Sequence, residues 1–162
     1  MTAQPITLTV NGEARPVDAE ARTLLVDVLR DHLGLRGTHI GCDSTSCGAC
    51  TVLLDGRAVK SCTMVAPQAE GSEIRTVESL AGGPDGPLHP LQEAFEAHFA
   101  FQCGYCTPGM LMAALAVYEA GGTPDRSEIR TALTGNLCRC TGYEPIIAAI
   151  EAALAAREEV PG

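Results

Sequence analysis

Residues 41–50 read Gly-Cys-Asp-Ser-Thr-Ser-Cys-Gly-Ala-Cys, and this run places three thiols, at Cys42, Cys47 and Cys50, within one short segment. Two glycines lie beside these cysteines, at Gly41 and Gly48. Because glycine has no Cβ and tolerates positive φ, these positions let the backbone turn sharply and bring its N–H groups close to the sulfurs. The run therefore predicts a tight loop that gathers thiolates around one site.

The spacing of the cysteines predicts the group that this loop holds. Cys-x4-Cys-x2-Cys, followed further along the chain by Cys62, is the plant-type spacing for a 2Fe-2S cluster, in which four thiolates hold two irons. Four thiolates on the oxidised cluster leave a negative site, so backbone N–H groups aimed at the sulfurs offset charge and help to set the reduction potential. We therefore predict a 2Fe-2S cluster whose ligands are Cys42, Cys47, Cys50 and Cys62.

The segments around this loop have the patterns of a small sheet packed on a helix. The turns Asn11-Gly12 and Asp55-Gly56 each join two extended runs, which is a strong hairpin signal. Thr23 is a predicted N-cap for a helix at residues 24–33, and Gly34 is placed where that helix would end. This order of elements predicts a β-grasp domain. Its strands are predicted at residues 5–10, 14–19, 50–54, 57–62 and 74–77.

The composition changes at residues 81–87, Ala-Gly-Gly-Pro-Asp-Gly-Pro, which indicates a linker. Beyond it the apolar residues recur at helical spacing, and Leu91, Phe95 and Phe99 predict one apolar stripe on a helix at residues 91–101. Thr107 is the predicted N-cap of the next helix, which should be buried on most sides. The further helices are predicted at residues 107–118, 124–133 and 144–156.

These patterns predict an α+β protein with two domains. Residues 1–80 would form a β-grasp, ferredoxin-like domain, and residues 81–162 would form a four-helix bundle. A chain of 162 residues with 46% apolar side chains can fill cores of this size.

Four more cysteines lie in the helical half as two close pairs, Cys103-x2-Cys106 and Cys138-x-Cys140. Each pair falls at a predicted corner between helices, so two corners that meet at one end of the bundle would present four thiolates to a single site. The start of the helix at Thr107 directs partial positive charge toward Cys103 and Cys106, which favours thiolate over thiol. Spacing alone leaves open a second iron-sulfur cluster and a structural zinc ion.

Disulfide bonds are the other common use of eight cysteines. Residues 1–10 show no basic start followed by an apolar stretch, which a secretory signal would have, and disulfide frameworks belong mainly to small secreted domains. Cys138 and Cys140 are also too close in sequence to suit two separate, well-formed bridges. We therefore expect the cysteines to bind metal.

Charge and hydropathy argue against several classes of function. The formal net charge is −9, whereas binding to nucleic acid or to anionic membranes depends on Lys and Arg. No apolar run approaches the roughly 20 residues that span a bilayer. We therefore expect a soluble, cytoplasmic protein with no nucleic-acid partner and no membrane span.

The cysteines and their flanking residues together resemble a known family. The segments cover nearly the whole chain and are similar to the iron-sulfur small subunit of molybdenum hydroxylases, the xanthine dehydrogenase and oxidase family. The resemblance is strongest to the bacterial three-subunit forms, including aerobic carbon monoxide dehydrogenase. The matching segments are Cys42-Asp-Ser-Thr-Ser-Cys47-Gly-Ala-Cys50, Lys60-Ser-Cys62, Gln102-Cys103-Gly-Tyr105-Cys106-Thr-Pro-Gly109 and Gly135-Asn-Leu-Cys138-Arg-Cys140-Thr-Gly-Tyr143.

This resemblance implies two 2Fe-2S clusters and two partner subunits. The second cluster, in the helical domain, would lie toward a molybdopterin cofactor in a large subunit, with Gln102 and Cys140 hydrogen-bonded to the pterin. The first cluster would face FAD in a medium subunit, and the whole would form a dimer of heterotrimers. The chain would pass electrons singly from molybdenum to flavin and would contain no catalytic residue. The ligands of the second cluster would be Cys103, Cys106, Cys138 and Cys140.

Other functions stay open on the sequence alone. A free-standing two-cluster ferredoxin would be purified without larger subunits, and a zinc-stabilised interaction module would contain zinc in place of iron. An iron-sulfur redox sensor is a further possibility, but the acidic charge and the lack of a recognition helix leave it nothing obvious to regulate. Because the large subunit selects the substrate in this family, carbon monoxide, aldehydes, purines and other N-heterocycles all remain open.

Overall fold

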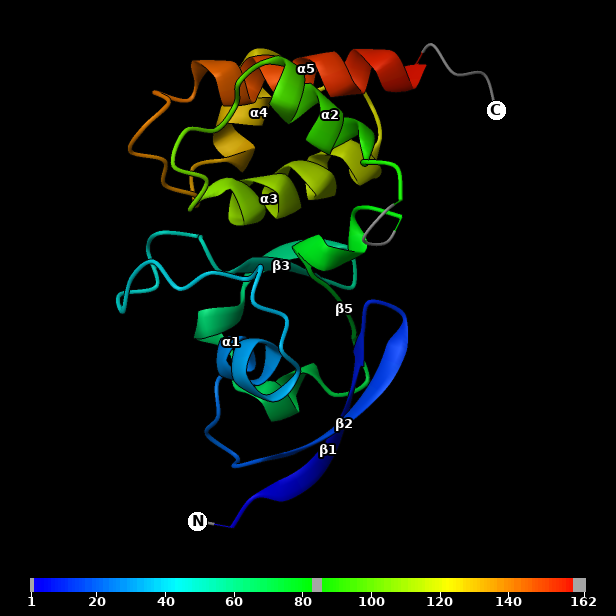
Figure 1. Cartoon of the computed structure of the whole chain (residues 1–162), viewed down its shortest axis with the longest axis vertical. Helices are drawn as coiled ribbons and strands as arrows, with labels where there is room; N and C mark the ends of the chain where they lie inside the picture. Colours follow the sequence, from blue (N-terminus) through cyan, green and yellow to red (C-terminus); the bar gives the residue numbers. More distant parts are fainter. Residues whose placement is uncertain (1, 83–85, 159–162) are drawn as a thin grey trace.

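The computed structural model describes residues 2–82 and 86–158 and shows a sheet with a short helix in one half and a group of helices in the other (Figure 1). The strands and the first helix come before the remaining helices in the chain. This is the α+β order that the sequence predicts. In Figure 1 the helical half lies above the sheet, and α3 is the helix next to it.

The strands of the described residues form one mixed sheet with the order β2-β1-β5-β3-β4. Neighbouring strands are antiparallel, except that β1 and β5 run parallel. The prediction of strand 57–62 is too long, because β4 ends at Lys60 and Cys62 lies in a 3-10 turn at Ser61–Thr63. The strands are β1 Gln4–Val10, β2 Glu13–Ala19, β3 Thr51–Leu54, β4 Arg57–Lys60 and β5 Glu73–Arg75.

Both predicted hairpin turns are confirmed by their backbone angles. Asn11 and Asp55 have φ values of 54° and 49°, and the glycines that follow them, Gly12 and Gly56, have 79° and 77°. Two successive residues with positive φ define the turn type that matches the twist of a hairpin. The turn at Asp55 reverses the chain between β3 and β4 and returns it toward the thiol loop.

The helix of the sheet half is shorter and less regular than predicted. α1 spans Leu25–Asp27 and continues as a π-helical turn, Val28–His32. The predicted N-cap at Thr23 is wrong: Leu24 occupies that position and makes no side-chain hydrogen bond. Its backbone instead pairs with Val65 in an isolated β-bridge, so the chain enters the helix from an extended conformation. The helix packs on the sheet around a core that includes Leu8, Leu25, Leu29, Val52 and Ile74.

The helical half contains α2 Pro90–Ala97, α3 Thr107–Ala120, α4 Arg126–Ala132 and α5 Glu144–Glu158. Residues 109–115 of α3 are all buried, because β3 lies on one side of this helix and α2, α4 and α5 lie on the other. The predicted burial of this helix is therefore confirmed. Leu53 of β3 belongs to the same core as the helices, whereas its neighbour Val52 belongs to the core of the sheet half.

Two predictions in the helical half are wrong. α2 ends at Ala97, and Phe99 lies beyond it with φ of 51° and is 81% exposed, so only Leu91 and Phe95 form the buried stripe. Thr107 is the first residue of α3 rather than its N-cap, because Cys106 occupies the cap position. The Thr107 hydroxyl is buried and has no hydrogen-bond partner among the described residues.

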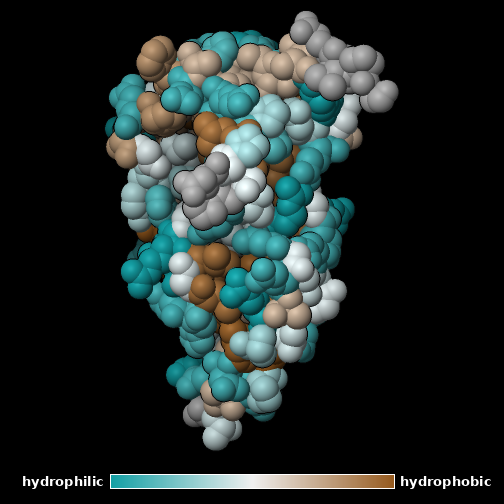
Figure 2. All heavy atoms as spheres, turned by 45° about the vertical axis from the view of Figure 1, so that its right-hand side comes forward, coloured by the Kyte–Doolittle hydropathy of each residue, from teal (hydrophilic) through white to brown (hydrophobic). Residues whose placement is uncertain are grey.

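The predicted linker at residues 81–87 includes residues 83–85, which lie outside the described part of the chain. The boundary between residues 80 and 81 therefore stays a prediction. The face in Figure 2 is largely hydrophilic, with apolar side chains in patches in both halves. No helix within residues 2–82 and 86–158 is long and apolar enough to cross a membrane.

Candidate metal centres

The first thiol site is formed by the loop that precedes β3. The N–H of Cys47 donates to Cys42 Sγ at 3.4 Å, and the N–H of Ala49 donates to Cys47 Sγ at 3.5 Å. These are the amide-to-sulfur contacts expected of a cluster loop. Thr45 and Gly48 have φ values of 60° and 71°, so the chain turns in the left-handed region twice between Cys42 and Cys50.

Cys62 is brought to this loop by the turn that follows β4. Ser61 donates twice to the carbonyl of Cys50, from its backbone N–H at 3.2 Å and from its hydroxyl at 2.8 Å. Lys60 extends along the loop, and its Nζ donates to the carbonyls of Thr45 and Ser46 at 2.9 and 3.2 Å. The structure therefore places all four predicted thiols of the first site at one end of the sheet.

The pKa values of these thiols differ because their surroundings differ. The N–H of Cys47 lowers the pKa of Cys42 to about 6. Burial raises the pKa of Cys47, and burial together with the neighbouring Cys50 raises the pKa of Cys62 to about 12. Because metal ligation requires thiolates, binding of a metal would release the protons of Cys47 and Cys62, whose pKa values are raised.

The second thiol site lies between the loop before α3 and the loop before α5. The Cys140 thiol donates to Cys103 Sγ at 3.5 Å, and both residues are exposed. Burial, followed by the hydrogen bond to Cys138, raises the pKa of Cys106 to about 12. Burial alone would raise the pKa of the Cys138 thiol. Its hydrogen bonds with Thr141 lower the pKa by more, so the pKa of Cys138 is lowered. The two predicted pairs therefore meet at one end of the helices, as the sequence indicates.

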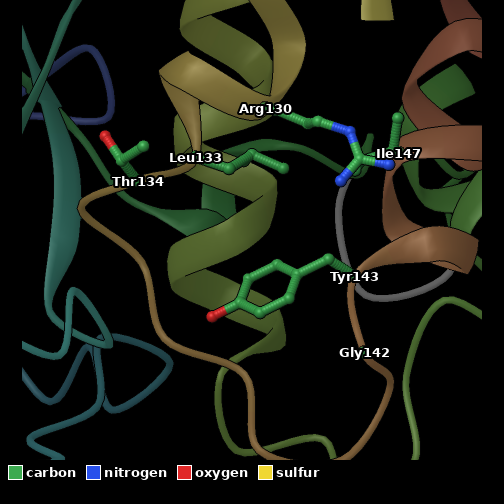
Figure 3. Close-up of a pocket in the computed structure, with 6 residues that line it drawn as sticks. All are labelled: Arg130, Leu133, Thr134, Gly142, Tyr143 and Ile147. Carbon is green, nitrogen blue, oxygen red and sulfur yellow. The ribbon is translucent and has the colours of Figure 1, made fainter. Parts of the chain in front are cut away.

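Tyr143 holds the loop that carries Cys138 and Cys140. Its hydroxyl accepts the N–H of Cys138 at 2.9 Å and lies 3.3 Å from the carbonyl of Asn136, to which it donates. The ring lines a cavity of about 230 Å³ beside α4, opposite the Arg130 side chain (Figure 3). Tyr143 itself has φ of 70°, which is rare for an aromatic residue and lets the loop turn back directly before α5.

The two sites open onto one hollow of about 510 Å³. Gly41 and Cys47 line it from the first loop, and Cys103, Cys106, Cys138 and Cys140 line it from the second. In Figure 1 the loops that carry the thiols all lie at the left-hand side, the first in cyan and the others in green and orange. The sites are therefore neighbours in space although they are far apart in the sequence.

The arrangement of thiols fits 2Fe-2S clusters. In the described residues no three side chains of Cys, His, Asp or Glu gather around one point in the manner of a single bound ion. In a 2Fe-2S cluster four thiolates hold two irons, so that each iron takes two thiolates from the protein. Pairs such as Cys103 with Cys140, and Cys106 with Cys138, match that requirement.

Sequence reasoning gave no structural role to several residues that shape these sites. Asn136 and Tyr143 lie in the segment that carries the resemblance, and Lys60 precedes Cys62, but their contacts join parts of the chain that only the fold brings together. The sequence shows only a polar residue two positions before Cys138, and its burial becomes visible in the structure alone. Gln102 is exposed at the rim of the second site, beside the exposed Cys103.

Comparisons with known proteins agree with this geometry. A model described as a 2Fe-2S iron-sulfur cluster binding domain matches residues 8–81, and one described as a [2Fe-2S] binding domain matches residues 76–151. The nicotine 6-hydroxylase small subunit of Paenarthrobacter nicotinovorans is 51% identical over 145 residues, which cover 90% of this chain and 86% of that protein. The aldehyde oxidoreductase iron-sulfur-binding subunit of Escherichia coli strain K12 is 44% identical over 91% of this chain and 70% of its own length.

The solved structures show the same likeness. The crystal structure of quinoline 2-oxidoreductase from Pseudomonas putida 86 contains a chain that superposes with a TM-score of 0.90 at 46% identity, covering 98% of this chain and 99% of that one. This chain belongs to the family of iron-sulfur small subunits of molybdenum hydroxylases, the xanthine dehydrogenase family. It is an electron-transfer subunit with two 2Fe-2S domains.

Proposed function

We propose that this chain carries electrons, one at a time, from a molybdopterin cofactor in a large subunit to FAD in a medium subunit. One 2Fe-2S cluster is held by Cys42, Cys47, Cys50 and Cys62. The other is held by Cys103, Cys106, Cys138 and Cys140. The clusters supply reversible one-electron chemistry, and the chain supplies their ligands, their spacing and the surfaces that face each partner.

The observation that carries this proposal is the difference in solvent exposure between the thiols of the two sites. Cys103 and Cys140 are exposed, whereas Cys50 of the first site is buried and the remaining thiols are half-buried. The second site therefore reaches the surface through its own ligands. An electron entry point needs such exposure, because a docked donor must come close to the cluster.

The side chains around the exposed thiols support docking of a protein there. Phe99, Phe101, Tyr105 and Leu137 are 81%, 44%, 51% and 55% exposed, and they lie in the same loops as Cys103, Cys106 and Cys138. Exposed aromatic and aliphatic side chains gathered on one surface are typical of protein interfaces. We assign this rim to the large subunit.

Gln102 and Cys140 are the residues we assign to the pterin. Both are exposed, and Gln102 directly precedes the exposed ligand Cys103. A side-chain amide can donate and accept at the edge of a heterocycle, and a thiolate that ligates iron can still accept a hydrogen bond.

The medium subunit is assigned to the other side of the first site. A hollow of about 270 Å³ lies there beside Cys42 and Cys62, and Ile40, which lines it, is 42% exposed. We infer that FAD in the medium subunit receives electrons at this hollow. The assembly is proposed to be a dimer of heterotrimers located in the cytoplasm.

The names of the relatives favour some substrates of the proposed complex over others. The expectation that the chain most resembles aerobic carbon monoxide dehydrogenase is not supported, because the relatives described above are named for nicotine, an aldehyde and quinoline. We therefore propose that the complex oxidises an N-heterocycle or an aldehyde rather than carbon monoxide.

Anaerobic reduction with dithionite, followed by EPR and metal analysis, tests the proposal. We expect about four irons per chain, two for each cluster, and two distinguishable spin-½ signals. Zinc in either site, or a single signal, would refute the electron-transfer function. Purification under native conditions tests the assembly: a chain that is always recovered without larger subunits would be a free-standing ferredoxin.

A further inference from the structure

Asn136 lies between the two thiol sites and is bonded to the segments beside both. Its side chain is 6% exposed. Its Nδ2 donates to the carbonyl of Gly48 at 2.9 Å, to the carbonyl of Gly109 at 3.0 Å and to the hydroxyl of Thr51 at 3.0 Å. Gly48 follows the ligand Cys47, and Asn136 itself lies two residues before Cys138. One amide group therefore connects the loop of the first site to the loop of the second.

The two loops also touch backbone to backbone at this point. A Cβ on Gly48 would lie 2.3 Å from the carbonyl oxygen of Gly135, and a Cβ on Gly109 would lie 2.3 Å from the carbonyl oxygen of Gly48. Both distances are far inside van der Waals contact, so only glycine fits. The N–H of Leu137 donates to the carbonyl of Cys47 at 2.8 Å, which places a first-site ligand one hydrogen bond from the residue before Cys138.

The Asn136 amide has no substitute in this contact. An Nδ2 group offers two N–H bonds, and here it faces three oxygen acceptors in a dry space. If the amide were lost, the carbonyl of Gly48 would keep its bonds from the Thr51 N–H at 3.1 Å and the Thr51 hydroxyl at 2.7 Å, but no amide would join it to the carbonyl of Gly109. The two carbonyl oxygens would then face each other with no shared donor, which is unfavourable for buried polar groups. The loops would then separate or admit water.

We propose that Asn136 is a positioning residue for electron transfer, because it sets the separation and orientation of the two clusters. The inference rests on the proposed function. In the step concerned, one electron passes from the second site to the first, so that the second site is oxidised and the first is reduced by one electron, and no bond forms or breaks. Asn136 acts on this step through Gly48 and Cys47 and takes no part in holding iron.

The first variant is Asn136→Asp, which keeps the shape of the side chain but replaces its donor with oxygen acceptors. The matched control is Asn11→Asp in the turn between β1 and β2. Asn11 accepts the N–H of Thr76 at 2.8 Å and donates to the Thr76 hydroxyl at 3.0 Å. An aspartate keeps the first bond and loses the second, because the Thr76 hydroxyl donates its own proton to Glu78 Oε2 at 2.6 Å. The control therefore introduces the same chemical change away from both thiol sites.

The second variant separates the loops without changing Asn136. Gly109→Ala places a methyl group against the carbonyl of Gly48, although alanine is the better residue for the helix itself. Its control is Gly135→Ala, whose Cβ would meet only Lys60 Cε at 3.6 Å and Nζ at 3.8 Å, which is ordinary contact. Thr51→Val is a milder third variant, because the Asn136 amide keeps both carbonyl acceptors and only the Thr51 hydroxyl is lost, together with its bond to the carbonyl of Gly48 at 2.7 Å.

The readout is the magnetic interaction between the two reduced clusters, seen as splitting or broadening of their EPR lines in the full chain. We expect Asn136→Asp and Gly109→Ala to retain about four irons and to lose this interaction, Thr51→Val to weaken it, and both controls to keep it. Because the rate of electron transfer falls as the distance between donor and acceptor grows, we also expect electron exchange between the sites to slow in Asn136→Asp and Gly109→Ala and to keep its wild-type rate in both controls.

An interaction that is unchanged in every variant that retains its iron would overturn the proposal. That result would leave the proposed function intact, since the wild-type chain would still hold two clusters. A wild-type chain without two EPR signals would instead refute the proposed function itself.

Discussion

Replacing Leu53 with alanine tests whether the sheet half and the helical half unfold as one unit. Leu53 belongs to β3, yet its side chain is fully buried in the core of the helices against α3. The change removes three methyl or methylene groups at about 0.8 kcal/mol each, and the cavity that remains brings the expected loss to about 3–4 kcal/mol. For a chain of this length that corresponds to a fall in unfolding temperature of about 10 °C.

The assay follows unfolding in denaturant with two probes, far-UV circular dichroism for the helices and the first-site cluster signal for the sheet half. We expect both probes to shift together, because coincident transitions are the mark of one cooperative unit. Val52→Ala is the matched control, since Val52 is fully buried in the other core and loses two carbon groups rather than three. It should shift the same single transition by a smaller amount, about 2 kcal/mol. If Leu53→Ala moved the helix signal alone and left the first site at its wild-type midpoint, the reasoning would be refuted.

Three further changes have expected outcomes. Gly48→Ala should lower the iron content of the first site and destabilise the chain by at least about 1–2 kcal/mol, because φ is 71° and the added Cβ would strike the carbonyl of Gly135; iron analysis and thermal unfolding check this. Lys60→Met should lower the reduction potential of the first-site cluster in a redox titration, because it removes a positive charge that is bonded to the loop carbonyls; an unchanged potential would contradict the assignment. Burial lowers the pKa of His89, whose Nδ1 accepts the N–H of Leu91 at the start of α2. As the pH falls, the imidazole of the unfolded chain is therefore protonated before that of the folded chain. The stability of the folded chain should then fall as the pH drops below about 6.5. His89→Asn keeps a residue that can cap α2 and should remove this loss of stability. The measurement is the unfolding temperature as a function of pH. If the variant kept the wild-type pH dependence, His89 would be excluded as the cause of the loss.

The parts of the fold that the sequence predicts are those encoded locally. The two hairpin turns need residues that accept positive φ, and Asn11-Gly12 and Asp55-Gly56 provide them in order. α3 is apolar around its circumference, which predicts burial without any knowledge of its neighbours. The cysteine spacing likewise encodes two four-thiol sites, and the fold brings each set together.

The wrong predictions have tertiary causes. Thr23 has the side chain of an N-cap, but the adjacent Leu24 is drawn into a bridge with Val65, which lies 41 residues further along the chain. Phe99 continues the apolar spacing of Leu91 and Phe95, but the helix ends at Ala97, before this residue. Asn136 acts through partners that are far away in sequence, so its type alone predicts nothing beyond a polar residue in a loop.

The backbone at Phe99 has a consequence for how the complex must be made. An aromatic residue with φ of 51° that is 81% exposed adds little to the stability of this chain and strains it locally. Until a partner covers that ring, it is an exposed apolar side chain through which newly made copies can associate with one another. Cells should therefore match the synthesis of this chain to that of the other subunits of its complex, and surplus copies should be the first to aggregate or to be degraded.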